Sequence, residues 1–196
     1  MSDNPYKVPD SDLEVNTDDS QKMFYVVSKQ KFALLFFSTL GIYLLYWFYK
    51  NWQMFKESSG KSIWPVPRAI FSIFFTHSLF REVDSVLNNN NKQFDWKPET
   101  LATIYVVFAI TSQVLDRMAI KEIASPYTDL MSILILPVIY LVLAKSQEAI
   151  NLSQNDPEGQ SNSTFTAANY VWIVLGLLFW AMVIFGFIIL LGFVDA

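Results

Sequence analysis

The sequence contains no cysteine and a single histidine among its 196 residues. Disulfides, thiol catalysis and cysteine-ligated metal sites are therefore excluded. His77 alone cannot build a metal site from several histidines of one chain. Charged residues are also few, at 16%, whereas an average soluble protein has roughly a quarter.

The common catalytic motifs are missing as well. The sequence has no nucleophile elbow, no HExxH pair, no glycine-rich phosphate loop and no intramembrane Ser-Lys or GxGD pair. We therefore expect neither an enzyme nor a bound cofactor or metal. The formal net charge is −4, with six acids in the first nineteen residues. Because nucleic-acid binding needs a basic face, we expect no nucleic-acid partner.

The residues that the chain does contain are strongly segregated. Hydrophobic residues make up 53% of the sequence and aromatic residues 16%, and the charges collect between the hydrophobic blocks. A helix needs ~20 apolar residues to cross a bilayer, and residues 170–194 form an uncharged run of 25. This pattern predicts an all-α, multi-pass membrane protein.

The blocks divide the chain into a tail and one helical domain. We expect residues 1–22 to be a disordered acidic tail, because little of it can be buried, and residues 23–196 to form a transmembrane domain. The expected helices cover residues 31–50, 67–88, 100–122, 128–147 and 169–194.

The segment over residues 67–88 is amphipathic in its second half, since Leu79, Phe80 and Val83 share one side and polar residues share the other. We therefore expect four transmembrane helices plus one amphipathic interfacial or re-entrant helix; the alternative is five transmembrane helices. The distribution of Lys and Arg favours the four-span arrangement with the N-terminus outside. Lys29 and Lys31, beside the first segment, argue for an N-terminus inside.

Two polar clusters interrupt the hydrophobic segments. They are His77, Arg81 and Asp84 in the second segment and Gln113, Asp116 and Arg117 in the third. Ionisable groups inside a bilayer are costly and usually functional, so the first cluster could be a proton relay or a headgroup-phosphate site. The alternative for that cluster is the wet face of an interfacial helix. For the second cluster, the simpler interpretation is a helix that has already left the membrane.

An aromatic cluster ends the first segment. Its members are Tyr46, Trp47, Tyr49, Lys50 and Trp52. Because Trp and Tyr gather at the depth of the headgroups, this cluster predicts an interfacial anchor. The alternative is a contact surface for a partner helix or a lipid headgroup.

Two stretches resemble known proteins. Asn4, Pro5, Tyr6 and Pro9, with Leu13, resemble the NPYxxPxxxL start of many uncharacterised bacterial membrane proteins. Residues 24–82, above all the TLGIYxxYWFYKNW region, resemble small DUF4234-like bacterial membrane proteins. The resemblance implies a multi-pass protein of the bacterial inner membrane, and it implies no activity.

These patterns lead to one leading hypothesis and one alternative. The leading hypothesis is a non-enzymatic accessory, scaffold or interaction subunit, which acts through helix packing and its acidic tail. Asn4, Pro5, Tyr6 and Pro9 are a candidate linear motif in that tail, and the alternative for them is a disordered tip. The expected partners of the subunit are membrane lipids and a membrane protein or a second copy of the chain. The alternative is a small oligomeric transporter or channel subunit.

Overall fold

The computed structural model describes residues 22–190, which form seven α-helices and one short 3₁₀ helix, with no strand in that range. The prediction of an all-α fold is confirmed for these residues. The helices are α1 (Lys29–Ser38), α2 (Tyr43–Ser59), α3 (Pro65–Ile70), α4 (Ser72–Asn89), α5 (Pro98–Ile120), α6 (Tyr127–Ser153) and α7 (Ala167–Leu190), with the 3₁₀ helix η1 at Gln160–Asn162.

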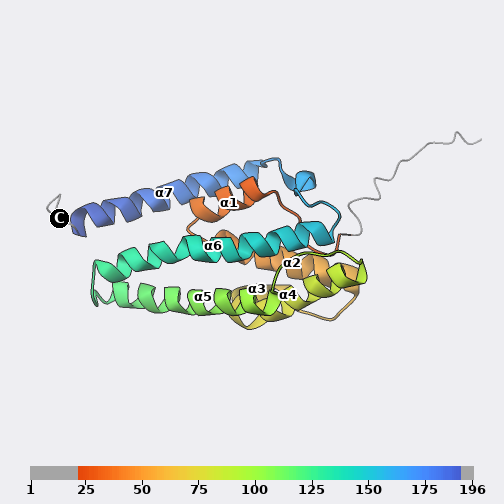
Figure 1. The fold of residues 1–196 in the computed structure, drawn as a ribbon. Coiled ribbons are helices and arrows are strands. Elements are labelled where there is room, and N and C mark those ends of the chain that lie inside the picture. Colours follow the sequence, from red (N-terminus) through yellow and green to blue (C-terminus); the bar gives the residue numbers. More distant parts are fainter. Residues whose placement is uncertain (1–21, 191–196) are drawn as a thin grey trace, which may run out of the picture.

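Three of these helices, α5, α6 and α7, are long and apolar enough to cross a membrane. Helices α5 and α6 pack against each other in opposite directions, and α7 packs against α1 and runs opposite to α6 (Figure 1). Large apolar side chains along all three remain exposed, including Val107 on α5, Leu141 on α6 and Phe185 on α7. Exposed apolar surface on this scale favours hydrocarbon as the surrounding solvent. The helices match three expected segments, although the end of the last one lies outside the described residues.

The expected helix over residues 31–50 is wrong, because the chain breaks into α1 and α2 between Thr39 and Ile42. Leu40 and Gly41 both have positive φ, at 52° and 83°. The Gly41 N–H donates to the Phe36 carbonyl at 2.9 Å and the Leu40 N–H to the Phe37 carbonyl at 3.3 Å. These paired hydrogen bonds form a Schellman motif, which ends a helix and turns the chain. The first segment is consequently a helical hairpin that returns to the end of the bundle where it began (Figure 1).

The expected helix over residues 67–88 is also divided. Phe71 leaves helical geometry, with φ −99° and ψ 39°, and separates α3 from α4. Helix α4 then runs antiparallel to α5, since the Ser72 hydroxyl lies 3.0 Å from that of Tyr105 and His77 Nε2 lies 3.1 Å from the Thr103 hydroxyl. Tyr105 is seven residues from the start of α5 at Pro98, which is about 10 Å at 1.5 Å per residue. The start of α4 is therefore level with a point about this far along α5.

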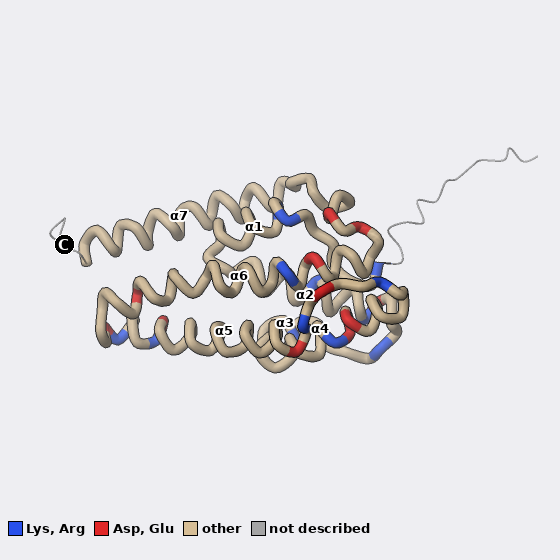
Figure 2. Tube along the Cα trace, in the orientation of Figure 1, with Lys and Arg blue, Asp and Glu red and all other residues tan. Residues whose placement is uncertain are grey.

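Charge is concentrated at one end of the bundle. Among the described Lys and Arg residues, only Arg117 and Lys121 lie near the turn between α5 and α6, and the others belong to the opposite end (Figure 2). Helix α7 carries no charge over its described length. This opposite end, called the charged end below, holds the first turn of α1, the second half of α2, and the ends of α4 and α6.

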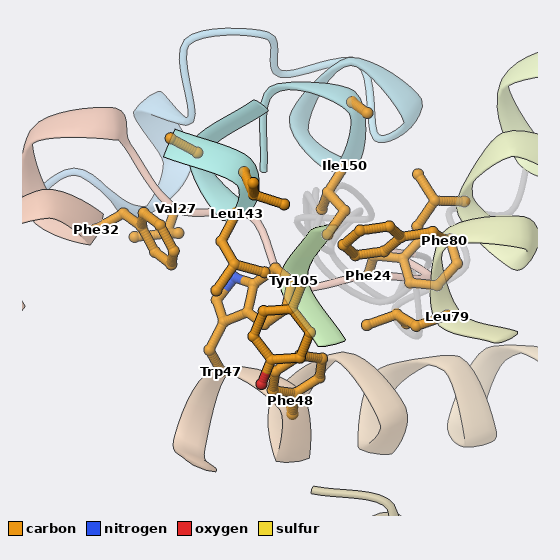
Figure 3. Packing of buried hydrophobic residues seen from close by; sticks show 14 of the residues in the cluster. Phe24, Val27, Phe32, Trp47, Phe48, Leu79, Phe80, Tyr105, Leu143 and Ile150 are labelled. Atoms are coloured by element: carbon orange, nitrogen blue, oxygen red, sulfur yellow. The ribbon is translucent and has the colours of Figure 1, made fainter. Parts of the chain in front are cut away.

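An aromatic core fills the charged end and joins α1, α2, α4 and α6 (Figure 3). Trp47 and Trp52, expected to be interfacial anchors, are 0% exposed. They are buried because α2 packs the face containing both rings against the other helices, so the predicted lipid contact does not hold for them. Tyr46 is exposed, whereas Tyr49 and Lys50 are half-buried.

Candidate interaction site

The described chain begins with an extended segment, residues 22–28, that passes through the aromatic core. Phe24, Val26 and Val27 are almost completely buried in it. An extended backbone inside a core needs external partners, because its N–H and C=O groups cannot satisfy each other. In this protein side-chain amides supply those partners.

Asn151 on α6 pairs with Val27 as a neighbouring β-strand would. Its Nδ2 donates to the Val27 carbonyl at 2.9 Å, and its Oδ1 accepts from the Val27 N–H at 3.3 Å. Gln147, one turn earlier on α6, donates from Nε2 to the Tyr25 carbonyl at 3.0 Å. Both amide side chains are almost completely buried.

Three further amide side chains hydrogen-bond to the backbone of the same segment. Asn51 Oδ1 on α2 accepts from the Tyr25 N–H at 3.1 Å, and Gln154 Oε1 accepts from the Met23 N–H at 2.6 Å. Asn162 Nδ2 donates to the Val26 carbonyl at 2.8 Å. We call Asn51, Gln147, Asn151, Gln154 and Asn162 the amide clamp. The clamp draws on α2, α6 and η1, so the segment can be held only when these elements are assembled.

The clamp is tied to the aromatic core through Trp47. Its Nε1 donates to Gln147 Oε1 at 2.5 Å, and the Gln147 amide also donates to Asn151 Oδ1 at 2.7 Å. The Trp47 indole N–H, the two amides and the Val27 backbone therefore form one connected buried network. Such a network rigidifies a core when every member has a partner.

The loop after α6 closes over the same segment. A Cβ on Gly159 would lie 2.5 Å from the Val27 carbonyl carbon and oxygen, so only glycine permits this approach. Gly159 also has φ +66°, a region that glycine adopts without strain. Lys31, 2% exposed, donates to Asn162 Oδ1 and to the Thr164 carbonyl, both at 2.7 Å, and joins the loop to α1.

Asp156 organises this loop from within. Its carboxylate accepts from the Gln160 N–H at 2.8 Å and from the Ser161 N–H at 2.9 Å. Burial alone would raise the pKa of Asp156, but hydrogen bonds from Ser161 and Gln160 outweigh it and lower that pKa below its ordinary value of 3.8. The charged carboxylate therefore stabilises the folded loop at neutral pH.

The first predicted cluster does not come together as a site. Arg81 Nε lies 3.6 Å from Glu99 Oε1, and His77 contacts Thr103. Asp84 accepts from Trp96 Nε1 at 2.9 Å and from Asn88. Each residue thus turns to a separate partner, and these contacts join α4 to α5 and to the loop before it.

The second predicted cluster lies near the end of α5 that is remote from the clamp. Gln113, Asp116 and Arg117 are all exposed, and Asp116 accepts a hydrogen bond from Ser132 on α6. The predicted motif residues Asn4, Pro5, Tyr6 and Pro9 lie outside the described residues.

The amide clamp was not predicted from the sequence, although one signal was present. Gln147, Asn151 and Gln154 stand at i, i+4 and i+7, so they share one face of a helix that is otherwise largely apolar. This polar stripe starts where the expected helix 128–147 stops, and α6 continues to Ser153 because the stripe faces residues 22–28 and not solvent.

The clamp contributes hydrogen bonding and fixed geometry, and it holds a chain segment in place. Among the described residues, no group of His, Asp and Glu side chains is arranged to hold a metal ion. In comparisons with protein-family models, curated proteins and solved structures, no match to this chain is found.

Proposed function

We propose that this chain is a non-enzymatic interaction subunit of the bacterial inner membrane, which presents residues 1–21 to a partner protein on the cytoplasmic side. In this proposal α5, α6 and α7 span the bilayer, while α1–α2 and α3–α4 enter and leave from the cytoplasmic side. The concentration of Lys and Arg at the charged end supports this orientation by the positive-inside rule. The bacterial location rests on the resemblance of residues 24–82.

One observation carries the proposal: the chain that follows residues 1–21 is fixed by side-chain amides from three separate elements, of which those on α2 and α6 include buried ones. A buried polar network that holds an extended segment is costly unless every group is paired. An attachment of this kind gives residues 1–21 a fixed exit point beside the charged end. A motif such as Asn4-Pro5-Tyr6 would then be tethered at a fixed point on the membrane surface.

The experiment is affinity purification of the full chain from its native membrane in mild detergent. The wild-type chain is compared with a deletion of residues 2–20 and with Tyr6→Ala. We expect the wild type to recover one reproducible partner, and both altered chains to lose it while keeping their helical content by circular dichroism.

Tyr6→Phe is the matched control, because it keeps the ring and removes only the hydroxyl. Partner recovery with this variant close to wild type supports recognition of the aromatic motif. Equal recovery of the same partner by the wild type and by the deletion would contradict the proposal.

A transporter or channel subunit is a second candidate, because an open groove of about 550 Å³ is lined by residues of α5, α6 and α7. Its lining includes Asp116, Asp129 and Ser132 together with apolar residues of α7. The test is cation flux into liposomes that contain the protein. Flux lower than wild type in Asp116→Asn, and equal to wild type in the exposed variant Gln113→Ala, would favour a transporter over a scaffold. If protein-free liposomes show the same flux as liposomes with the wild-type chain, the transporter candidate is ruled out.

A further inference from the structure

An exposed aromatic patch surrounds α3. Its members are Trp64 at 75% exposed, Val66 at 54%, Ile70 at 60%, Phe71 at 54% and Phe74 at 72%. We call these five residues the α3 patch. So many large apolar side chains on six helical residues and their neighbours cannot be left in water without a covering surface.

The depth of the α3 patch is set by its neighbour Ser72. Because the Ser72 hydroxyl lies 3.0 Å from that of Tyr105, the deep end of the patch is level with the interior of α5, a helix long enough to span. Trp64, at the other end, precedes the two prolines that begin α3. The patch therefore runs from the edge of the expected hydrocarbon layer into it.

Arg68 lies within the patch and has no acidic partner. Its guanidinium carbon is 4.3 Å from the centroid of the Trp52 ring and 5.0 Å from that of Phe75. Among residues 22–190, these ring contacts are the only interactions of the guanidinium group, which has no hydrogen-bond acceptor and no carboxylate partner there. Lys61, in the loop before α3, differs, since its ammonium group is 2.8 Å from Glu82 Oε1.

Contacts with the Trp52 and Phe75 rings hold the guanidinium in place. Its planar fork of hydrogen-bond donors matches the geometry of a phosphate. We infer that Arg68 binds the phosphate of an anionic phospholipid, whose acyl chains cover the α3 patch. The apolar side chains of the patch and the cation among them, which has no acidic partner, match the acyl chains and the phosphate of one lipid molecule. A second copy of the chain would cover the apolar residues but would have to supply an acid to Arg68.

The test uses the full chain purified in mild detergent and dioleoylphosphatidylglycerol as the probe, with bound lipid counted by native mass spectrometry. We expect Arg68→Gln to weaken lipid binding about tenfold, the effect of one charge-assisted contact. Arg81→Gln is the matched control, because Arg81 is an exposed arginine already paired with Glu99. Arg81→Gln should bind the lipid as the wild type does.

Three further results decide between lipid and other occupants. Millimolar inorganic phosphate should leave the lipid bound, and dioleoylphosphatidylcholine should bind more weakly than the anionic lipid. Displacement by free phosphate, equal binding by Arg68→Gln, or disulfide cross-linking between copies of a Trp64→Cys variant would each overturn the inference.

A measurement that leaves Arg68 in place covers the case in which Arg68→Gln does not fold. A fluorophore on the introduced thiol of a Val66→Cys variant should be quenched more strongly by brominated phosphatidylglycerol than by brominated phosphatidylcholine. The same label in a Glu122→Cys variant, far from the α3 patch, should show no such difference. Equal quenching at position 66 by the two lipids would contradict the inference.

Discussion

The side chain of Asn151 makes the two hydrogen bonds that the backbone of a neighbouring β-strand residue would make. An amide group offers a donor and an acceptor in one plane, which is the pair that an extended residue presents. The Asn151 side chain therefore satisfies both the N–H and the carbonyl of Val27. A serine or an aspartate could not do both as well, since each lacks the paired geometry of an amide.

Replacing Asn151 by alanine is expected to destabilise the fold by about 1–3 kcal/mol, because it leaves two buried backbone groups of Val27 without partners. The measurement is thermal unfolding of the purified chain in one fixed detergent. Asn88→Ala is the control, since Asn88 is exposed and its side chain bonds, within residues 22–190, to Asp84 alone. Equal melting temperatures for the two variants would show that the clamp contributes nothing.

Asp156 should make the stability of the loop depend on pH. Its folded pKa lies below the ordinary value of 3.8, so its contribution is present above pH 3.8 and is lost as the pH falls through the lowered value. The gap in melting temperature between the wild type and Asp156→Asn should therefore be largest near neutral pH and shrink below pH 3.8. Asp95→Asn, at an exposed position, should give a gap that stays small throughout.

At the scale of elements, the α1–α2 hairpin is stabilised from outside by α7. The turn leaves backbone carbonyls at the end of α1, and the Trp180 indole N–H donates to the Phe37 carbonyl at 2.8 Å. Gly176, one turn earlier on α7, lies directly against the Ser38 carbonyl. Helix α7, which carries no charge over its described length, is thus attached to the rest of the protein mainly where α1 ends.

Gly176→Ala should weaken this attachment, because a Cβ would overlap the Ser38 carbonyl oxygen, and backbone must move to admit it. Overpacking of this kind costs about 1–3 kcal/mol. Gly186→Ala on the same helix meets nothing within 4 Å and should be neutral or slightly stabilising. The two variants are compared by melting temperature and by protease cleavage between α6 and α7. A melt and a cleavage rate for Gly176→Ala that match those of Gly186→Ala would rule out the close packing.

The elements differ in how far the sequence reveals them. Helices α5, α6 and α7 follow from hydrophobic length alone, because a bilayer imposes that length on any span. The break at Leu40 and Gly41 does not follow from length, since residues 32–49 carry no charge to mark it. Only Thr39-Leu40-Gly41 hints at a helix end, and a lone glycine is common within transmembrane helices.

The candidate site was harder to predict than the fold because its partner is backbone. Gln147 and Asn151 bond to an extended segment more than a hundred residues away in sequence, and a single sequence gives no sign of that pairing. The predicted residues His77, Arg81 and Asp84 stood out because they are ionisable, yet they pair locally along α4 and α5. Trp47 was misassigned for a related reason, since a ring at headgroup depth and a ring in a core look alike in sequence.

At the scale of the whole molecule, the α1–α2 hairpin and the division between α3 and α4 explain a charge distribution that two single spans over these segments could not. Once α1 and α2 return to the same end, Lys29 and Lys31 join Lys56 and Lys61 there. The conflict between these lysines and the other basic loops then disappears. The proposed orientation, with the N-terminus inside and the end of α7 outside, agrees with the positive-inside rule.

Side-specific labelling of single cysteines measures this arrangement most directly, because the chain has no native cysteine. Exposed Gln30, Glu57, Glu122 and Glu158 are each replaced by cysteine, one at a time. Sealed right-side-out and inside-out vesicles are then treated with a membrane-impermeant thiol reagent. We predict that the Gln30→Cys, Glu57→Cys and Glu158→Cys variants are labelled from the cytoplasmic side and the Glu122→Cys variant from the other. Labelling of Gln30→Cys and Glu57→Cys from opposite sides would show that residues 31–50 cross the membrane and would contradict the account.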